Sequence, residues 1–373
     1  MGASNNRVLH VIDHLTAASG VASVVMQCIT GIHQIKQDIA LYGQYDSYMG
    51  NVVKECGGKV HTLPEVTKSL GKNFSKSFSQ LMRDNSYNII HGHLMNSAFI
   101  YLREAKQAGV PCRIIHAHSA TSADTVIKRV RNNILSFGIP LWANKFIAVS
   151  NEAALYAFGR NIEKKTNIAI IHNGIDSERF KYDPVVREKT RKELGLTEDT
   201  LCVGNIARFT ELKNHNFLID VFGEMKKKAN CVLLMIGEGP TKKAIIKKIN
   251  DSGFSNAVRI LVSRQNIEQL YQAFDILILP SLKEGFGLVA LEAQCAGLNC
   301  VVSEFVPQTI SCSGNIRFLP LGNAALWSDT ALKMTSNQRS DGSAGVNEAK
   351  LDSATMCGKI LKVYDSVKGN SAC

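Results

Sequence analysis

No apolar run in this sequence reaches the roughly 18 uncharged residues that a membrane-spanning helix requires. Residues 1–7 are short and polar and lead directly into an expected strand, so we expect no signal peptide. The 10 cysteines are scattered, mostly inside apolar segments, and none forms a Cys-x-x-Cys pair or has zinc-ligand spacing. These absences argue against a membrane-spanning protein and against a disulfide or zinc scaffold. They favour a cytoplasmic protein with reduced, buried thiols.

Nucleic-acid-binding motifs are absent as well, although the chain is basic. Its formal net charge is +11, and residues 1–180 carry 19 Lys and Arg against 12 Asp and Glu, so most of the excess lies in the first half. Aromatic residues are not interleaved with these cations, which argues against a nucleic-acid partner. The partner that we expect for the basic half is an anionic membrane surface, which predicts a protein peripheral on the cytoplasmic membrane.

What the sequence does contain is an alternation of short apolar segments and helical segments along its 373 residues. The apolar segments are almost uninterrupted by polar residues, as expected of parallel strands covered on both faces. Two such series predict an α/β protein with two Rossmann-like, doubly wound domains, residues 1–180 and 181–350. Residues 177–199 are polar and predict a linker, and residues 351–373 predict a final amphipathic helix. The expected strands are 7–12, 38–42, 59–63, 88–91, 113–116, 145–149 and 168–171, then 201–207, 231–236, 258–262, 276–279 and 300–303.

The most informative motif is a pair of glutamates, Glu284 and Glu292. The first follows an expected strand, and the second lies in the next expected helix, on the side that faces the loop. The glycines between them allow close backbone approach to a ligand, and the helix start offers free N–H groups to an anion. Two carboxylates for hydroxyl groups and one helix start for phosphate suit a sugar nucleotide. The alternative is a solvated loop and an ordinary surface helix. The candidate donor-binding residues here are Glu284, Gly285, Phe286, Gly287, Leu288 and Glu292.

Two cations, Arg208 and Lys213, follow the first strand of the second domain. Cations at the carboxyl end of a strand can clamp a diphosphate and neutralise its charge as it leaves. The alternative is a pair of surface cations. The next strand ends at Gly237 in a Gly-Glu-Gly-Pro turn, which either contacts phosphate or base or is an ordinary strand-to-helix turn. Arg264, after the following strand, is a candidate contact for the nucleotide base.

In the first domain, Gly20 opens an expected helix, but one glycine does not make a dinucleotide fingerprint. This helix start is a candidate for the acceptor side. Two His-x-His pairs end strands, at 91–93 and 116–118. Metal binding would need further ligands, and no Asp, Glu or His cluster in the sequence supplies them, so we expect no metal. Most of these histidines are expected to be hydrogen-bonded structural residues, whereas His118 is expected to face the cleft.

Residues 126–135 place three basic residues among apolar ones at helical spacing. Two interpretations stay open for this segment. It is either a basic amphipathic helix that lies on an anionic membrane or a domain helix with a solvated basic face.

Together these residues resemble the retaining glycosyltransferases of family 4. The resemblance covers almost the whole chain, and its second-domain motifs are specific in combination. It is carried by the Glu-x7-Glu pair at 284 and 292, the diphosphate-binding pair Arg208 and Lys213, the Gly-x-Gly-Pro turn at 237–240, the Asn-Gly-Ile-Asp element at 173–176, and the segment His116-Ala117-His118-Ser119, which resembles the bacterial capsule and exopolysaccharide branch.

The resemblance implies the GT-B fold, in which two Rossmann-like domains face each other across a cleft and a C-terminal helix crosses back to the first. It implies that Glu284 binds hydroxyls of the donor sugar and that Glu292 binds the ribose. Arg208 and Lys213 would hold the diphosphate. His118 would lie beside the anomeric carbon and, with Glu284, would form the catalytic pair. No cofactor or obligatory metal is implied, and the sequence lacks an Asp-x-Asp motif, since cations and a helix start can replace a divalent ion.

The activity implied is transfer of a hexose or N-acetylhexosamine, with retention, from a UDP-sugar to a glycan or lipid-linked glycan in cell-surface polysaccharide biosynthesis. Two alternatives stay open, a sugar-nucleotide epimerase of the same fold and a non-catalytic scaffold subunit. The Glu-x7-Glu pair argues against the epimerase. A scaffold would be expected to lose one of four residues that this chain keeps, namely Arg208, Lys213, Glu284 and Glu292.

Overall fold

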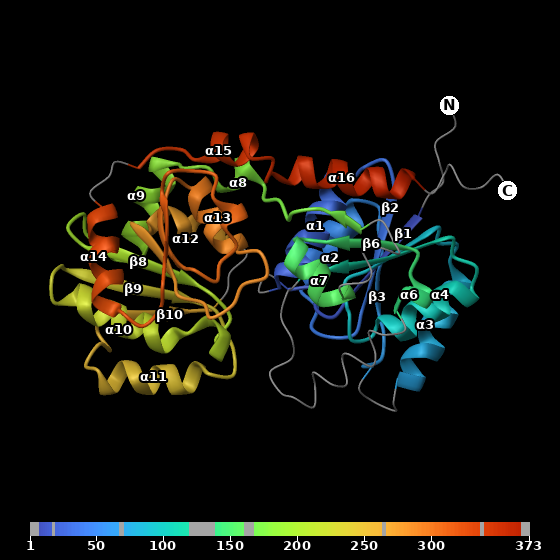
Figure 1. The fold of residues 1–373 in the computed structure, drawn as a ribbon, viewed down its shortest axis with the longest axis horizontal. Coiled ribbons are helices and arrows are strands. Elements are labelled where there is room, and N and C mark those ends of the chain that lie inside the picture. Colours follow the sequence, from blue (N-terminus) through green and yellow to red (C-terminus); the bar gives the residue numbers. More distant parts are fainter. Residues whose placement is uncertain are drawn as a thin grey trace. The chain divides into compact units, whose positions relative to one another are not determined.

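The computed structural model of the protein describes residues 7–16, 19–66, 71–118, 139–159, 168–262, 266–335 and 339–366. The chain folds into two compact units (Figure 1). The first unit comprises Met1–Asn173 and Ser353–Cys373, and the second comprises Gly174–Asp352. Each unit contains a parallel sheet covered by helices, so the prediction of two Rossmann-like α/β domains is confirmed.

The sheet of the first unit has the strand order β3-β2-β1-β4-β5-β6-β7, and all of its pairs are parallel. The order reverses between β1 and β4, which makes the carboxyl end of these strands the topological switch point. The strands are β1 (Arg7–Ile12), β2 (Lys36–Leu41), β3 (Val60–Thr62), β4 (Ile89–Gly92), β5 (Cys112–Ala117), β6 (Lys145–Ala148) and β7 (Ile168–Ile170). The helices are α1 (Gly20–Gly31), α2 (Ser47–Glu55), α3 (Lys72–Asp84), α4 (Ala98–Gln107), α6 (Ile139–Trp142), α7 (Asn151–Phe158) and α16 (Ser353–Asp365).

Alternation of side chains along these strands builds a hydrophobic core on each face of the sheet. In β1, Leu9 and Val11 join a cluster with α3 and α4, whereas Ile12 joins a cluster with α1 and α2. The last helix, α16, packs on α1 (Figure 1), and its Tyr364 is fully buried. One face of this sheet is therefore covered by helices from both ends of the chain.

The sheet of the second unit has the order β10-β9-β8-β11-β12-β13, again parallel throughout, with its switch point between β8 and β11. The strands are β8 (Leu201–Ile206), β9 (Cys231–Ile236), β10 (Val258–Leu261), β11 (Ile276–Leu279), β12 (Asn299–Ser303) and β13 (Ile316–Leu319). The helices are α8 (Ser177–Phe180), α9 (Pro184–Glu193), α10 (His215–Lys226), α11 (Lys242–Asp251), α12 (Ile267–Ala273), α13 (Leu288–Cys295), α14 (Ala324–Met334) and α15 (Ser343–Glu348).

The central strand β11 is buried on both faces. Ile276 and Ile278 pack with α10 and α14, and Leu277 and Leu279 pack with α12 and α13. Each such side chain stabilises the fold by about 1.5–3 kcal/mol when fully buried. The loop that follows β11 therefore begins from a strand that is packed against helices on both faces and paired with β8 and β12 on its two edges.

The prediction of a linker over residues 177–199 is wrong, because α8 and α9 form there. Asp183 caps α9 by accepting two backbone N–H bonds, and Pro184 occupies the first turn, where its missing N–H is not needed. Arg191 of α9 is only 8% exposed, and its Nη1 lies 3.0 Å from Oδ2 of Asp275, which precedes β11. An ion pair thus anchors this polar helix in place of a wide apolar stripe, and periodicity alone does not reveal it.

The boundary between the units lies at Asn173, before the position at residue 180 expected from the sequence. The N–H of Ile175 donates to the carbonyl of Leu351 at 3.0 Å, and Phe180 belongs to a core of the second unit. The chain therefore enters and leaves the second unit through adjacent backbone segments.

The expected strands omit β13. This strand lies at the edge of its sheet and, in the described part of the chain, pairs with β12 alone. Its second residue, Arg317, is exposed and interrupts an already short apolar run, so the segment carries little signal of its own.

Within the described part of the chain, no helix combines the length and the apolar character needed to cross a membrane. Of the nine cysteines there, all but Cys56 and Cys312 are buried, as the sequence predicts for most of them.

Candidate functional site

Three loops at the carboxyl ends of central strands in the second unit are hydrogen-bonded to one another. The N–H of Leu282, after β11, donates to the carbonyl of Leu212, after β8, at 2.8 Å. The N–H of Phe209 donates to the carbonyl of Glu238, after β9, at 2.9 Å. Because β8 and β11 flank the switch point, this is the edge at which open α/β sheets bind ligands. Segments far apart in sequence therefore form one candidate site.

An ion pair joins two predicted residues in these loops. Lys213 ends a 3-10 turn, Glu211–Lys213, and its Nζ lies 2.6 Å from Oε1 of Glu284. The same oxygen accepts a hydrogen bond from Oγ of Ser281 at 2.7 Å. The side chain of Glu284 is 9% exposed and that of Lys213 is 24% exposed, so this charge-assisted bond is partly shielded from water. Within the described residues, the second oxygen of Glu284 makes no hydrogen bond and can accept one from a ligand.

Arg208, the other predicted cation, lies directly after β8 and is exposed. In the part of the chain that the structure describes, Arg208 forms no ion pair, whereas Lys213 is held by Glu284. The two cations therefore share a loop but differ in environment. Arg208 is the one available to an anionic ligand. Arg264, the candidate base contact, lies outside the described residues.

Gly237 has a backbone conformation that other residues rarely adopt. Its φ is +149°, and an added Cβ would lie 2.1 Å from the carbonyl oxygen of Ala207. The glycine therefore allows the loop after β9 to pack directly against the loop after β8. The close approach expected from the sequence is, in this structure, an approach of one loop to another.

The loop after β11 enters α13 through Gly287, whose φ of +92° favours glycine. Among the described residues, no side chain caps this helix, so its first N–H groups face the loop without a side-chain partner there. Phe286 is 3% exposed and packs in the hydrophobic core, so it anchors the loop to that core. Gly285 and Leu288 are half-buried on either side of this anchor.

Glu292 lies within α13 and has a different partner from Glu284. The hydroxyl of Tyr271, in α12, donates to Oε2 of Glu292 at 2.5 Å. Burial raises the pKa of Glu292 from 4.5 to about 7, while the bond from Tyr271 and the nearby charge of Arg179 oppose this rise. Glu292 is therefore close to half ionised near neutral pH. The structure joins Glu284 to Lys213 and leaves Glu292 in a separate hydrogen-bonded pair.

We expect the raised pKa of Glu292 to contribute to the pH dependence of the free energy of unfolding. Its folded-state pKa is raised to about 7, so the folded protein binds more protons than the unfolded chain between the two pKa values. This stabilisation is fully present below the unfolded pKa and is lost as pH rises through about 7. In urea unfolding at about pH 5 and pH 8, the wild type should lose more stability than Glu292→Gln. The exposed-site control Glu348→Gln should behave like the wild type. Equal losses in all three proteins would contradict the prediction.

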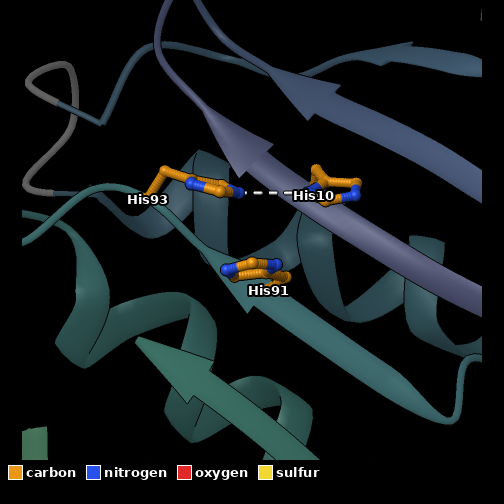
Figure 2. Close-up of side chains that lie close together, drawn as sticks. All are labelled: His10, His91 and His93. Carbon is orange, nitrogen blue, oxygen red and sulfur yellow. Dashed lines mark hydrogen bonds between the residues drawn. The ribbon is translucent and has the colours of Figure 1, made fainter. Parts of the chain in front are cut away.

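The first unit contains a second cluster of predicted residues, on the face of the sheet covered by α1 and α16. His10 and His91 are register partners on the adjacent strands β1 and β4, which places their rings side by side (Figure 2). Ring centroids of neighbouring members lie between 4.0 and 5.5 Å apart. The members, here called the histidine cluster, are His10, His91, His93, His116 and His118.

The expectation that no further metal ligands lie near the His-x-His pairs is wrong. Neighbouring strands supply them, and two sets of three ring nitrogens lie within 4.8 Å of one another. These sets are His10, His91 and His93, and His93, His116 and His118. The pairs looked isolated because their partners lie on strands that are adjacent in the sheet but distant in the sequence. The prediction that the reaction needs no metal is a separate statement and stays a prediction.

Burial keeps the imidazoles of the histidine cluster neutral. It lowers the pKa of His10 to about 4, against the opposing influence of Gln37 and Asp38. It lowers the pKa of His118 to about 3. The pKa values of the other three members are also lowered well below 6.5, by burial first and then by repulsion from neighbouring histidines.

A residue from the last helix bonds to this cluster. The hydroxyl of Tyr364, in α16, lies 2.6 Å from Nδ1 of His91, and Nε2 of His91 lies 3.2 Å from Nδ1 of His116. Nothing in the sequence pattern points to Tyr364, and His10 was not singled out. A signal for His10 was present, because a histidine interrupts the otherwise apolar strand β1.

The expected helix start in the first unit is present as α1. Oγ of Ser19 accepts from the N–H of Ala22 at 3.2 Å and caps the helix, and Gly20 is exposed with open space beside it. The basic segment 126–135 lies outside the described residues, so both interpretations of it stay predictions.

Two sequence families match this chain. Residues 19–179 match the family described as "Glycosyltransferase Family 4", and residues 186–311 match "Glycosyl transferases group 1". The two matches correspond closely to the two units.

Individual proteins are similar over most of the chain. The putative glycosyltransferase EpsF of Bacillus subtilis is 26% identical over 339 residues, which cover 88% of each chain. UDP-Gal:alpha-D-GlcNAc-diphosphoundecaprenol alpha-1,3-galactosyltransferase of Escherichia coli is 27% identical over 61% of this chain and 60% of its own. Among solved structures, Anabaena Alr3699/HepE in complex with UDP and glucose has a TM-score of 0.79 at 19% identity, covering 96% of this chain and 99% of that one. The glycosyltransferase WaaG has a TM-score of 0.73 at 14% identity, covering 97% and 100%.

Proposed function

This chain belongs to glycosyltransferase family 4 and has the GT-B type of fold, and from this premise we propose the reaction that it catalyses. It transfers a hexose or N-acetylhexosamine from a UDP-sugar to a glycan or lipid-linked glycan, with retention at the anomeric carbon. The product belongs to cell-surface polysaccharide biosynthesis. Similarity to a galactosyltransferase named for a diphosphoundecaprenol acceptor, and to a fold neighbour determined with UDP and glucose, supports this proposal.

The observation that carries the proposal is the ion pair between Lys213 and Glu284 at the switch point of the second unit. It sets a cation and a carboxylate with a free oxygen beside the open start of α13. A sugar diphosphate needs these groups together, because its phosphates attract cations and helix N-termini while its hydroxyls donate to carboxylates.

The proposed donor site gives each residue one task. The second oxygen of Glu284 accepts a hydrogen bond from a hydroxyl of the transferred sugar. Glu292, in its ionised form, accepts hydrogen bonds from the ribose hydroxyls. Arg208 and Lys213 bind the diphosphate and stabilise the charge that develops on it during departure. The first N–H groups of α13 add to that stabilisation. These groups stand in for a divalent cation, so we propose that no metal is obligatory.

The proposed acceptor side lies in the first unit. His118 contacts the reacting sugar or the acceptor hydroxyl, and Gly20 leaves room for the acceptor beside the start of α1. The basic excess of the first half attracts the chain to an anionic membrane surface, where lipid-linked acceptors reside. The proposed location is the cytoplasmic face of the membrane, with the protein bound peripherally.

We expect purified protein to transfer sugar from one member of a UDP-sugar panel to a lipid-diphosphate-linked saccharide. The assay should follow UDP release and the product mass, with and without EDTA. NMR of the product should show the anomeric configuration of the donor retained. Release of UDP with a modified free sugar, in the absence of acceptor, would instead identify an epimerase. UDP-sugar binding without turnover across the acceptor panel would indicate a scaffold subunit.

A further inference from the structure

The side-chain amide of Gln37, in β2, has only one orientation that satisfies its neighbours. Its Nε2 lies 2.8 Å from the carbonyl oxygen of Cys28 and 3.1 Å from that of Ile32. Both carbonyls can only accept, so the NH2 group must face them. The amide oxygen therefore faces Nε2 of His10, at 2.9 Å. Gln37 is 3% exposed, and the end of α1 holds it in this orientation.

This orientation determines which nitrogen of His10 carries the proton. An amide oxygen can only accept, so Nε2 of His10 must donate to it. His10 is fully buried and its two ring nitrogens bond to an amide and to another imidazole, with no carboxylate among the described residues bonded to either, so burial favours the neutral ring and its Nδ1 carries a lone pair. The partner of that lone pair is Nε2 of His93, at 3.0 Å, as drawn in Figure 2.

The same constraint applies in turn to two more rings. Nε2 of His93 must donate to His10, and a neutral His93 then has a lone pair on Nδ1. Nε2 of His118 lies 2.8 Å from this Nδ1 and must donate to it. A neutral His118 is therefore protonated on Nε2 and carries its lone pair on Nδ1. Within the described residues, this Nδ1 is buried and has no hydrogen-bond partner.

We infer that Gln37, acting through His10 and His93, is a positioning residue that fixes the tautomer of His118 and aims its bare Nδ1 at a substrate hydroxyl. The inference rests on the proposed function, in which His118 contacts the reacting sugar or the acceptor. It adds residues that do not touch substrate, and it specifies the chemistry of His118 as a hydrogen-bond acceptor. The ligand group that this acceptor binds is a hydroxyl, which donates its hydrogen to Nδ1. An oxyanion at the same position would be repelled by the lone pair on Nδ1.

The series His118–His93–His10–Gln37, here called the histidine series, ends at an amide and leads no proton out of the cluster. If Nδ1 of His118 received a proton, charge could pass through His93 only as far as His10, because leaving the series would require His10 to release the proton on its Nε2 to Gln37. An amide oxygen is too weak a base to accept it near neutral pH. The histidine series therefore ends in a fixed acceptor, and its role is to orient the ring of His118, as hydrogen-bond partners set the tautomers of histidines in other proteins.

Selective 15N labelling of histidine tests the inference in the wild-type protein, before any variant is made. The NMR spectrum distinguishes protonated from unprotonated ring nitrogens, and single His→Asn variants assign the signals. We expect His10, His93 and His118 each to carry the proton on Nε2. A protonated Nδ1 on His118 would overturn the inference. Stoichiometric bound metal, with histidine signals that change on chelation, would also overturn it and would identify the histidine cluster as a metal centre.

Two variants of Gln37 then separate positioning from packing. Gln37→Met keeps the length of the side chain but removes the acceptor, so the tautomers of His118 should become mixed and transfer should fall about tenfold or more. Gln37→Glu, protonated in this buried position so that its OH donates to the carbonyl of Cys28, keeps an acceptor beside His10 and should recover most of the single-tautomer signal and of the transfer rate. A variant Gln37→Met whose His118 keeps a single Nε2–H tautomer would contradict the inference.

UDP binding, measured by calorimetry, distinguishes failure of the tautomer inference from failure of the proposed function. UDP is expected to bind the second unit, so its affinity should be unchanged in both Gln37 variants. A protein with the expected tautomers that neither binds UDP nor transfers sugar would leave the histidine series correct and the proposed function wrong. Normal transfer combined with the wrong His118 tautomer would leave the proposed function correct and the histidine series wrong.

Discussion

Glu284→Gln should reduce the rate of sugar transfer by about two to three orders of magnitude, the loss typical of removing one group that stabilises a transition state. Glutamine keeps the shape of the side chain and can still accept from Ser281, but it removes the charge that faces Lys213 at 2.6 Å. It also replaces one carboxylate oxygen with an amide NH2, which cannot accept a sugar hydroxyl. The measurement is kcat and KM with the preferred UDP-sugar, together with UDP affinity, which should change less than tenfold.

A matched ion pair on the surface of the same unit gives the control. Lys228 and Asp329 lie 2.5 Å apart, but their side chains are 40% and 52% exposed. Asp329→Asn removes an equivalent charge away from the switch point and should leave transfer unchanged. Transfer by Glu284→Gln at the rate of Asp329→Asn would show that Glu284 is a structural partner of Lys213 and not a catalytic residue.

Asp275→Ala should lower the free energy of unfolding of the second unit by about 3 kcal/mol, the lower end of the range for breaking a buried ion pair by removing one partner, because the Asp275 side chain is 18% exposed. The carboxylate of Asp275 accepts from Arg187, from Nη1 of Arg191 at 3.0 Å and from the N–H of Cys202 at 2.6 Å. Alanine leaves two guanidinium groups without their counter-ion and one backbone N–H without an acceptor. The anchor of α9 is lost as well.

The stability of the second unit can be followed by its own tryptophan. The sequence contains 2 tryptophans, and Trp327 is buried in the second unit, so a Trp142→Phe background reports on that unit in urea. Asp251→Ala is the control, because its pair with Lys247 lies on α11 with side chains 61% and 77% exposed. That change should cost less than about 1 kcal/mol. A similarly small effect of Asp275→Ala would mean that α9 is held by its apolar contacts alone.

The strands of both sheets were largely predictable, and the reason is local. β1, β9 and β11 have the expected bounds because each is a short run of apolar residues closed by polar or turn-forming ones. α9 was not predictable in this way. Its residues are mostly charged, and the carboxylate with which Arg191 pairs, that of Asp275, lies more than 80 positions away. β13 was missed because an exposed arginine divides an edge strand of four residues.

The candidate site shows the same division. The residue types that a donor site needs could be predicted from the sequence, since Arg208, Lys213 and Glu284 each follow a predicted strand. Which of these residues pair with one another could not be predicted. Lys213 is held by Glu284 while Arg208 is exposed, and Glu292 is bonded to Tyr271 of a different helix. These partners are set by the order of strands in the sheet, which brings β8 beside β11.

By itself, the sequence determined the two parallel-sheet domains, the family and the glycine-containing turns at the ends of strands. These features depend on the spacing of apolar residues and on backbone conformations that each segment expresses alone. Only the tertiary structure decided which polar groups meet. The strand order β2-β1-β4-β5 gathers Gln37 and the histidine cluster onto one face of a sheet, although the chain separates Gln37 from His118 by two intervening strands. The tautomer of His118 depends on that gathering, because a proton on a neutral imidazole is positioned by whichever acceptor the fold brings to it.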